Sequence, residues 1–264
     1  MAKNPIVFIH GLWMHSNTWQ PWMQFFSANG YECFNPDWPG DGATVEASRA
    51  NSRAIANHGI KEVADNYARV IASLPAPPIL IGHSFGGLLA QILLGRGVAA
   101  AAVAIDPAPM KGVWQLPLTA LRASLPVLGN PFNLTKAVSL SFKQFRYAFA
   151  NMISEQEAKE LYDRCTVPSP ARPLFQVAAA TLNPGAESKV NTVNSTRGPL
   201  LITSGDKDHI VPPVLCKAAF SQYRKSSAIT ELVSFEARGH SLTIDHGWKE
   251  VAEYSLAWLN KKGF

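Results

Sequence analysis

The sequence predicts an α/β protein with a doubly wound, mostly parallel sheet and a helical cap inserted into it. Short apolar segments bounded by Gly and Pro alternate with longer segments in which apolar residues recur at helical spacing. Such alternation is typical of βαβ units, which build parallel sheets. Between residues 110 and 197 the alternation stops and only helical patterns continue. A structureless loop of that length is uncommon, so this segment is expected to form a cap.

The expected core elements follow one another in the order that such a sheet requires. Strands are expected at the short apolar runs, which occupy residues 6–9, 31–35, 79–82, 99–105, 200–204 and 229–235. Apolar residues at helical spacing predict helices at residues 18–29, 60–74, 85–95, 214–223 and 248–260. These elements make a complete core from residues 1–109 and 198–264.

The cap is expected to comprise residues 110–197. Amphipathic patterns predict helices at residues 116–125, 134–152 and 155–165, and a cluster of prolines follows them. The first half of the cap contains no acidic residue but five basic ones, Lys111, Arg122, Lys136, Lys143 and Arg146. This charge is either a solvated basic face or an attraction for an anionic substrate or membrane surface. No nucleic-acid-reading motif accompanies it, so nucleic acid is not an expected partner.

The composition excludes several classes of protein. Apolar residues make up 47% of the chain and charged residues 16%, a balance that disordered chains do not have. The longest apolar run, Val98 to Ile105, is far shorter than the roughly 20 residues of a transmembrane helix. The first residues lack the pattern of a signal peptide, so a cytoplasmic location is expected. The 3 cysteines are widely spaced and are expected to be free thiols.

A Gly-x-Ser-x-Gly motif at residues 82–86 indicates where the chemistry takes place. It lies between an apolar strand pattern and an apolar helix pattern, which predicts a sharp strand-to-helix turn with Ser84 at its apex. Gly82 and Gly86 would let neighbouring elements approach without a Cβ clash. The Ser84 hydroxyl would then project at the carboxyl edge of the sheet, where open α/β sheets bind ligands.

Two later residues can activate this serine. A serine hydroxyl needs a base that takes its proton and a third group that orients the base. Asp208 follows the strand at 200–204 and His240 follows the strand at 229–235, so both should meet Ser84 at one edge of the sheet. We therefore predict Ser84 as the nucleophile, His240 as the base and Asp208 as the acid.

With these residues in place, the chain resembles the α/β-hydrolase superfamily over nearly its full length. Residues 205–212 match the G-x-x-D-x-x-[VL]-P pattern around the family's acid, and His240 matches the histidine after the last strand. His10-Gly11-Leu12 resembles the family's H-G-x loop. The resemblance implies that the backbone N–H groups of Leu12 and Phe85 form the oxyanion hole. It also implies a hydrolase that needs no cofactor.

Some features separate the chain from particular branches of that superfamily. Residues 38–42, Trp-Pro-Gly-Asp-Gly, replace the commoner Arg-Gly-His-Gly turn, and the two N-terminal strands of larger members are missing. Ser84 stands where epoxide hydrolases and haloalkane dehalogenases carry aspartate. Ser241 stands where hydroxynitrile lyases place a lysine. The subfamily is therefore left open.

Other residues compete for the same roles. Asp106 is a rival for the acid, because some relatives present their acid after the strand that precedes the cap. Asp206 is a weaker rival and is expected to bond within its own turn. His209 is expected at the rim of the site or exposed, whereas His10 and His83 are expected to brace loops. No histidine pair has the spacing of metal ligands, so no metal is expected.

Aromatic residues are the candidates for substrate contact. Trp13 and Trp38 lie in loops beside the expected site, where they either pack or touch the substrate. In the cap, one apolar pattern comprises Leu116, Leu118, Leu121, Leu125, Phe142, Phe145 and Phe149. These residues either pack helices onto the sheet or line an acyl pocket over Ser84.

The sequence therefore predicts a serine hydrolase that cleaves an ester, lactone or thioester with an apolar acyl or alcohol portion. A carbon-carbon bond hydrolase or a perhydrolase with the same three residues remains open. So does a non-catalytic ligand receptor on the same fold. A small-molecule substrate is the expected partner, and the oligomeric state is not predicted.

Overall fold

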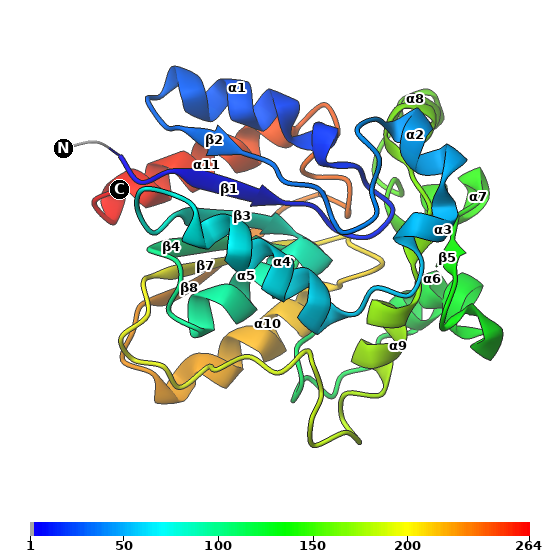
Figure 1. Ribbon diagram of the computed structural model, residues 1–264. Coiled ribbons are helices and arrows are strands. Elements are labelled where there is room, and N and C mark those ends of the chain that lie inside the picture. Colours follow the sequence, from blue (N-terminus) through cyan, green and yellow to red (C-terminus); the bar gives the residue numbers. More distant parts are fainter. Residues whose placement is uncertain (1–2) are drawn as a thin grey trace.

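A six-stranded parallel sheet runs through the centre of the computed structural model, which describes residues 3–264 (Figure 1). Its strand order is β2-β1-β3-β4-β7-β8, and every neighbouring pair is parallel. The strands are β1 (Ile6–Ile9), β2 (Cys33–Phe34), β3 (Ile79–His83), β4 (Ala101–Ile105), β7 (Leu200–Gly205) and β8 (Thr230–Phe235). The doubly wound class that the alternating pattern predicts is confirmed.

Helices cover both faces of the sheet, which is why β1, β3 and β4 are buried throughout. One face packs against α4 (Ile60–Ala72), α5 (Phe85–Gly95) and α10 (Pro213–Ser221). The other face packs against α1 (Gln20–Ala28) and α11 (Trp248–Lys261), as Figure 1 shows. The carboxyl ends of the strands stay free of these helices and are available for a site.

The edges of the core differ from the expected ranges. Strand β2 has two residues instead of the expected 31–35, because it pairs with β1 only along Cys33 and Phe34. The 3-10 turns η1 (Ser16–Trp19) and η3 (Gln222–Lys225) form parts of the expected helices at 18–29 and 214–223. Two short helices that the pattern did not predict, α2 (Val45–Ala50) and α3 (Ser52–Ile55), precede α4.

Residues 110–197 are called the inserted segment below. Its helices lie beyond the carboxyl ends of the strands, at the right of Figure 1, and its last part runs back past Gly95 of α5 to the start of β7. Its elements are α6 (Leu118–Leu128), η2 (Pro131–Asn133), β5 (Ala137–Val138), α7 (Phe142–Ala148), α8 (Glu155–Cys165), β6 (Ser169–Pro170) and α9 (Arg172–Ala178). The segment contains helices, as expected, and α8 matches its expected range, but more than half of its residues lie outside helices. Among residues 3–264, no helix combines the length and the hydropathy needed to cross a membrane.

The expected single helix at 134–152 is wrong. Strand β5 occupies its first part and pairs antiparallel with β6. A new helix, α7, begins only after Ser141, whose side chain forms a capping box with Gln144. Helix α9 was also not expected, because the prolines before it suggested a break. Pro173 lies in its first turn, where a helix tolerates proline.

The leucines of the inserted segment do not point where either sequence interpretation placed them. Leu116 is 75% exposed, Leu118 83%, Leu121 42% and Leu125 61%. They therefore neither pack on the sheet nor line a pocket over Ser84. The buried side of α6 carries smaller residues, Ala123 and Val127.

Trp13 ties the inserted segment to the core. Its backbone N–H donates to the Ser169 hydroxyl, and its carbonyl accepts the N–H of Val167 at 3.0 Å. The indole Nε1 donates to the carbonyl of Val138, also at 3.0 Å. Trp13 has a φ of 65°, which a tryptophan adopts only where its surroundings enforce it. The loop after β1 and the inserted segment are thus held against each other.

Candidate active site

Ser84 occupies the sharp turn between β3 and α5 that the motif predicts. Its φ of 57° and ψ of −121° are strained for a residue with a side chain. The turn is possible because glycines flank it. A Cβ on Gly82 would lie 2.1 Å from the Gly86 carbonyl oxygen, and a Cβ on Gly86 would lie 1.9 Å from that of Ile9. The turn therefore holds Ser84 at the carboxyl edge of the sheet.

His240 and Asp208 form a buried pair. The His240 Nδ1–H donates to Asp208 Oδ2 at 2.5 Å, and both side chains are completely buried. The other oxygen, Oδ1, accepts the N–H groups of Ile210 at 2.7 Å and Val211 at 2.8 Å. Burial alone would raise the pKa of Asp208. The charge and hydrogen bond of His240, with those from Asp106 and Val211, outweigh burial and lower that pKa to about 2. Asp208 is therefore ionised and can orient an imidazole.

The second nitrogen of His240 is free. Among residues 3–264, Nε2 is buried and has no hydrogen-bond partner. The ring lies against His83, the residue before Ser84, with a centroid separation of 4.5 Å. Burial lowers the pKa of His83 well below its ordinary value, so His83 is a neutral neighbour. A ring nitrogen without a partner beside the turn is in a position to accept a proton.

Two backbone N–H groups are also available near Ser84. Gly11 lies directly against the turn, since a Cβ on it would be 2.8 Å from Ser84 Cβ and 3.4 Å from Phe85 N. In the described part of the chain, neither the N–H of Leu12 nor that of Phe85 is used in a hydrogen bond. Trp38 holds the loop after β1 by donating its Nε1–H to the His10 carbonyl at 3.1 Å. Paired free N–H groups are the usual construction of an oxyanion hole.

Asp106, the rival acid, lies close to Asp208, but the His240 Nδ1–H bonds Asp208. It is fully buried, and its Oδ1 accepts the N–H of Gly205 at 2.9 Å. Burial, followed by the charge of Asp208, raises the pKa of Asp106 well above its ordinary value. The protonated form, which cannot balance the charge of an imidazolium, is therefore favoured at Asp106 more than at Asp208.

The buried acids do not offer a ready metal site. Possible ligand atoms of Asp106, Asp208 and His240 lie within 4.8 Å of one another. However, burial favours the protonated form of Asp106, and the Asp208 oxygen nearest the ring is engaged by Nδ1–H. The expected weaker rival, Asp206, pairs with Lys207 in its own turn and also accepts the N–H of Arg238, from the turn after β8, at 3.3 Å.

The structure divides the expected substrate-binding aromatics into two groups. The Phe149 ring lies 4.9 Å from that of His240, and Trp13 and Phe145 pack against Phe149 at 6.1 and 5.3 Å. The other two rings have different partners. Phe142 packs against Tyr162, and Trp38 packs against His10. His209, expected at the rim or exposed, is half-buried and lies against Tyr147, 4.6 Å between ring centroids.

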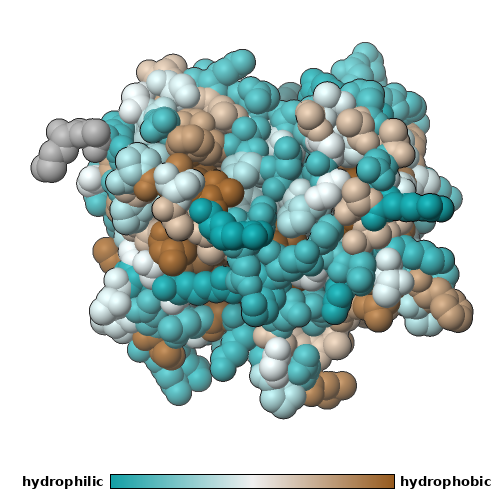
Figure 2. Space-filling model, viewed as in Figure 1, coloured by the Kyte–Doolittle hydropathy of each residue, from teal (hydrophilic) through white to brown (hydrophobic). Residues whose placement is uncertain are grey.

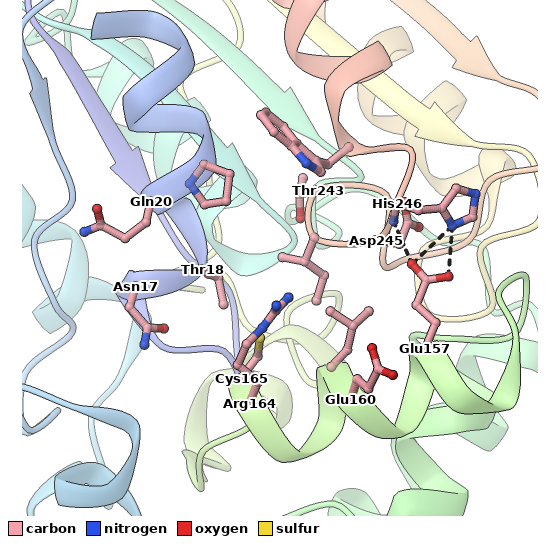
Figure 3. Close-up of a pocket in the computed structure, with 14 residues that line it drawn as sticks. Asn17, Thr18, Gln20, Glu157, Glu160, Arg164, Cys165, Thr243, Asp245 and His246 are labelled. Carbon is pink, nitrogen blue, oxygen red and sulfur yellow. Dashed lines mark hydrogen bonds and ion pairs between the residues drawn. The ribbon is translucent and has the colours of Figure 1, made fainter.

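A hollow that sequence reasoning missed lies elsewhere, between η1, α8 and the start of α11. It has a volume of about 460 Å³, and Figure 3 shows Arg164 and Cys165 facing Thr18 across it. Its wall includes the pair His246 and Glu157, whose Nδ1 and Oε2 are 2.9 Å apart. None of Ser84, Asp208 or His240 lines it. This concavity is formed by packing α8 across the core and is separate from the serine site.

Comparisons with known proteins agree with this geometry. The family described as "Alpha/beta hydrolase family" matches residues 6–254. A monoacylglycerol lipase of Paleococcus ferrophilus has a similar structure, with 21% identity, a TM-score of 0.70 and coverage of 98% of this chain and 96% of its own. An extracellular alpha/beta-hydrolase from a Paenibacillus species is 20% identical, with a TM-score of 0.71 and coverage of 97% and 98%.

A methylesterase from Arabidopsis is similar at 16% identity, with a TM-score of 0.69 and coverage of 98% of this chain and 99% of its own. No curated protein sequence gives a match to this chain. The family match extends over nearly the whole chain and includes the turn at Ser84, the Asp208 turn and His240. The chain therefore belongs to the alpha/beta hydrolase family.

Proposed function

We propose that this protein is a serine hydrolase that cleaves carboxylic esters through an acyl-enzyme intermediate. One observation carries the proposal. The buried pair of Asp208 and His240 presents a free Nε2 beside a strained serine turn. A strained backbone and a buried charged pair both have an energetic cost, and such costs concentrate at functional sites.

In the proposed acylation step, Ser84 Oγ attacks the ester carbonyl carbon while His240 Nε2 takes the hydroxyl proton. The carbonyl oxygen becomes an oxyanion, which the N–H groups of Leu12 and Phe85 stabilise. The intermediate then expels the alcohol, and the His240 imidazolium returns the proton to it. Water repeats the sequence on the acyl-enzyme and releases the acid. Asp208 keeps Nδ1 protonated throughout, which leaves Nε2 as the acceptor.

We propose that residues 110–197 act as a cap that determines the substrate. Ser84 is only 5% exposed and His240 is fully buried, so the inserted segment must move before a substrate reaches them. Phe149 and Trp13 would form the wall nearest the reacting atoms, with Phe145 behind them. An apolar wall favours an apolar acyl group, which fits an ester, with lactones and thioesters as chemically related substrates.

A series of chromogenic esters of increasing acyl length tests the proposal, with Ser84→Ala as the matched variant. This variant should lower kcat by about 10⁴ or more while the melting temperature stays near that of the wild type. A fluorophosphonate probe should label the wild type and not the variant. An unlabelled, folded wild-type protein that still binds esters would instead indicate a ligand receptor.

The wall can be tested separately. Phe149→Ala should shift the preferred acyl length and preserve hydrolysis of a small acetyl ester, because pocket shape discriminates by roughly 1 to 3 kcal/mol per methylene. Phe142→Ala is the control, since Phe142 packs against Tyr162 and not against His240. Equal loss on all esters, with a lowered melting temperature, would show that Phe149 is only a core residue.

A further inference from the structure

The start of the inserted segment exposes a row of large apolar side chains, here called the 114–132 surface. The exposed fractions are 67% for Trp114, 75% for Leu116, 83% for Leu118, 42% for Leu121, 61% for Leu125 and 78% for Phe132. In Figure 2, hydrophobic surface appears at the lower right edge, where Figure 1 places α6. Single exposed apolar residues are common, but six large ones within one short stretch of the chain indicate an interaction site.

Helix α6 is built to present this set. Leu118, Leu121 and Leu125 are three and four residues apart, so they lie on one face of the helix. Ala123 and Val127 lie on the opposite face and are buried. The larger residues thus point outward and the smaller ones inward. Packing within the chain does not explain that choice, whereas an external apolar partner does.

The charge around the 114–132 surface narrows the choice of partner. Residues 110–154 hold five basic side chains and no acidic one. Among residues 3–264, none of these five forms an ion pair. Lys136 and Lys143 are exposed. The apolar row is therefore accompanied by positive charge that nothing in the described chain neutralises.

We propose that the 114–132 surface docks onto an anionic lipid surface. Leucine, tryptophan and phenylalanine side chains enter the headgroup boundary, and nearby lysines and arginines interact with anionic headgroups. A second copy of the chain fits less well. A symmetric dimer through this face would bring the same basic residues together, and like charges repel. Docking does not depend on the proposed reaction, so either can fail alone.

Vesicle co-sedimentation tests the proposal. The wild-type protein should bind vesicles of phosphatidylcholine mixed with phosphatidylglycerol at least about tenfold more tightly than vesicles of phosphatidylcholine alone. Leu118→Asp and Leu125→Asp should each weaken binding by about tenfold or more, because a leucine that enters the lipid on docking is replaced by a charge. Lys136→Glu should weaken it by about fivefold or more and flatten its salt dependence.

Val193→Asp is the matched control. Val193 is 57% exposed, a fraction similar to that of Leu125, but it lines a hollow with Ile92 of α5 and with Arg96, and no residue of α6 lines that hollow. This variant should bind mixed vesicles as the wild type does. All variants should keep the wild-type melting temperature, since every altered side chain is exposed.

Four results would overturn the proposal. The wild type could fail to bind mixed vesicles, or it could bind both kinds of vesicle equally. Leu118→Asp could bind as tightly as Val193→Asp. Finally, sedimentation velocity could show a wild-type dimer that Leu118→Asp converts to a monomer, which would assign the face to a second copy of the chain.

Discussion

The turn after β7 and the turn after β4 each hold one buried aspartate, and they shift the pKa values of the two carboxyls in opposite directions. Asp208 accepts two backbone N–H groups and the imidazole N–H, and its pKa falls to about 2. Asp106 accepts one backbone N–H, and its pKa rises well above the ordinary value. Both side chains are fully buried, so burial does not explain why their pKa values shift in opposite directions. The difference comes from the number of donors and from the nearby positive charge.

The largest effect on activity should come from replacing Asp208, the carboxyl with the lowered pKa. Asp208→Asn should lower kcat on a short chromogenic ester by about 10⁴, because the amide favours the wrong imidazole tautomer. Circular dichroism should show an intact fold. A kcat within tenfold of the wild type would mean that His240 does not depend on Asp208.

The same carboxyl should contribute to stability at the acid end of the pH range. Its folded pKa of about 2 lies below the unfolded value of 3.8, so the stabilisation is present above pH 4 and is lost as the pH falls through 2. Urea unfolding of the wild type should lose on the order of 2 kcal/mol between these pH values. The Asp208→Asn protein should not show this loss. If the unfolding free energies of the wild type and Asp208→Asn changed equally with pH, the lowered pKa of Asp208 would be contradicted.

Asp106 should show the reverse trend. Because its folded pKa is raised, the wild type gains stability from this group only at low pH and loses it as the pH rises above 3.8. Asp106→Asn does not titrate. The stability of this variant relative to the wild type should therefore increase from pH 4 to pH 8, as measured by urea unfolding. A constant difference would show that Asp106 is ionised like its neighbour.

The smallest effect is expected for the activity of the Asp106→Asn variant. Asn at position 106 keeps an oxygen for the Gly205 N–H and a donor toward Asp208, so kcat should stay within about fivefold of the wild type. If Asp106→Asn instead loses more activity than Asp208→Asn, the role of the acid belongs to Asp106.

The core was predictable because the apolar pattern of its sequence matches the burial of its strands and helices. Strand β1 and helix α5 match their expected ranges, since strands buried on both faces read as apolar runs and Gly82 and Gly86 mark the turn between sheet and helix. The edge strand β2 was overestimated. Its length depends on pairing with β1, and composition alone does not report pairing.

The inserted segment was less predictable for a different reason. Helical periodicity shows that Leu118, Leu121 and Leu125 share a face, but not whether that face turns toward the protein or away from it. Likewise, the sequence identified Asp106 and Asp208 as candidates. Their protonation states depend on donors from Gly205 and Val211, whose positions only the folded backbone fixes.

Trp13 links the inserted segment mechanically to the Leu12 amide. Both of its backbone groups and its indole nitrogen are bonded to the inserted segment, and it directly follows Leu12. If the inserted segment lifts to admit a substrate, as we propose, it must either break those three bonds or pull the Leu12 amide away from Ser84. In the second case, the proposed oxyanion hole would be complete only while the segment is closed, so water entering the open form would not be activated.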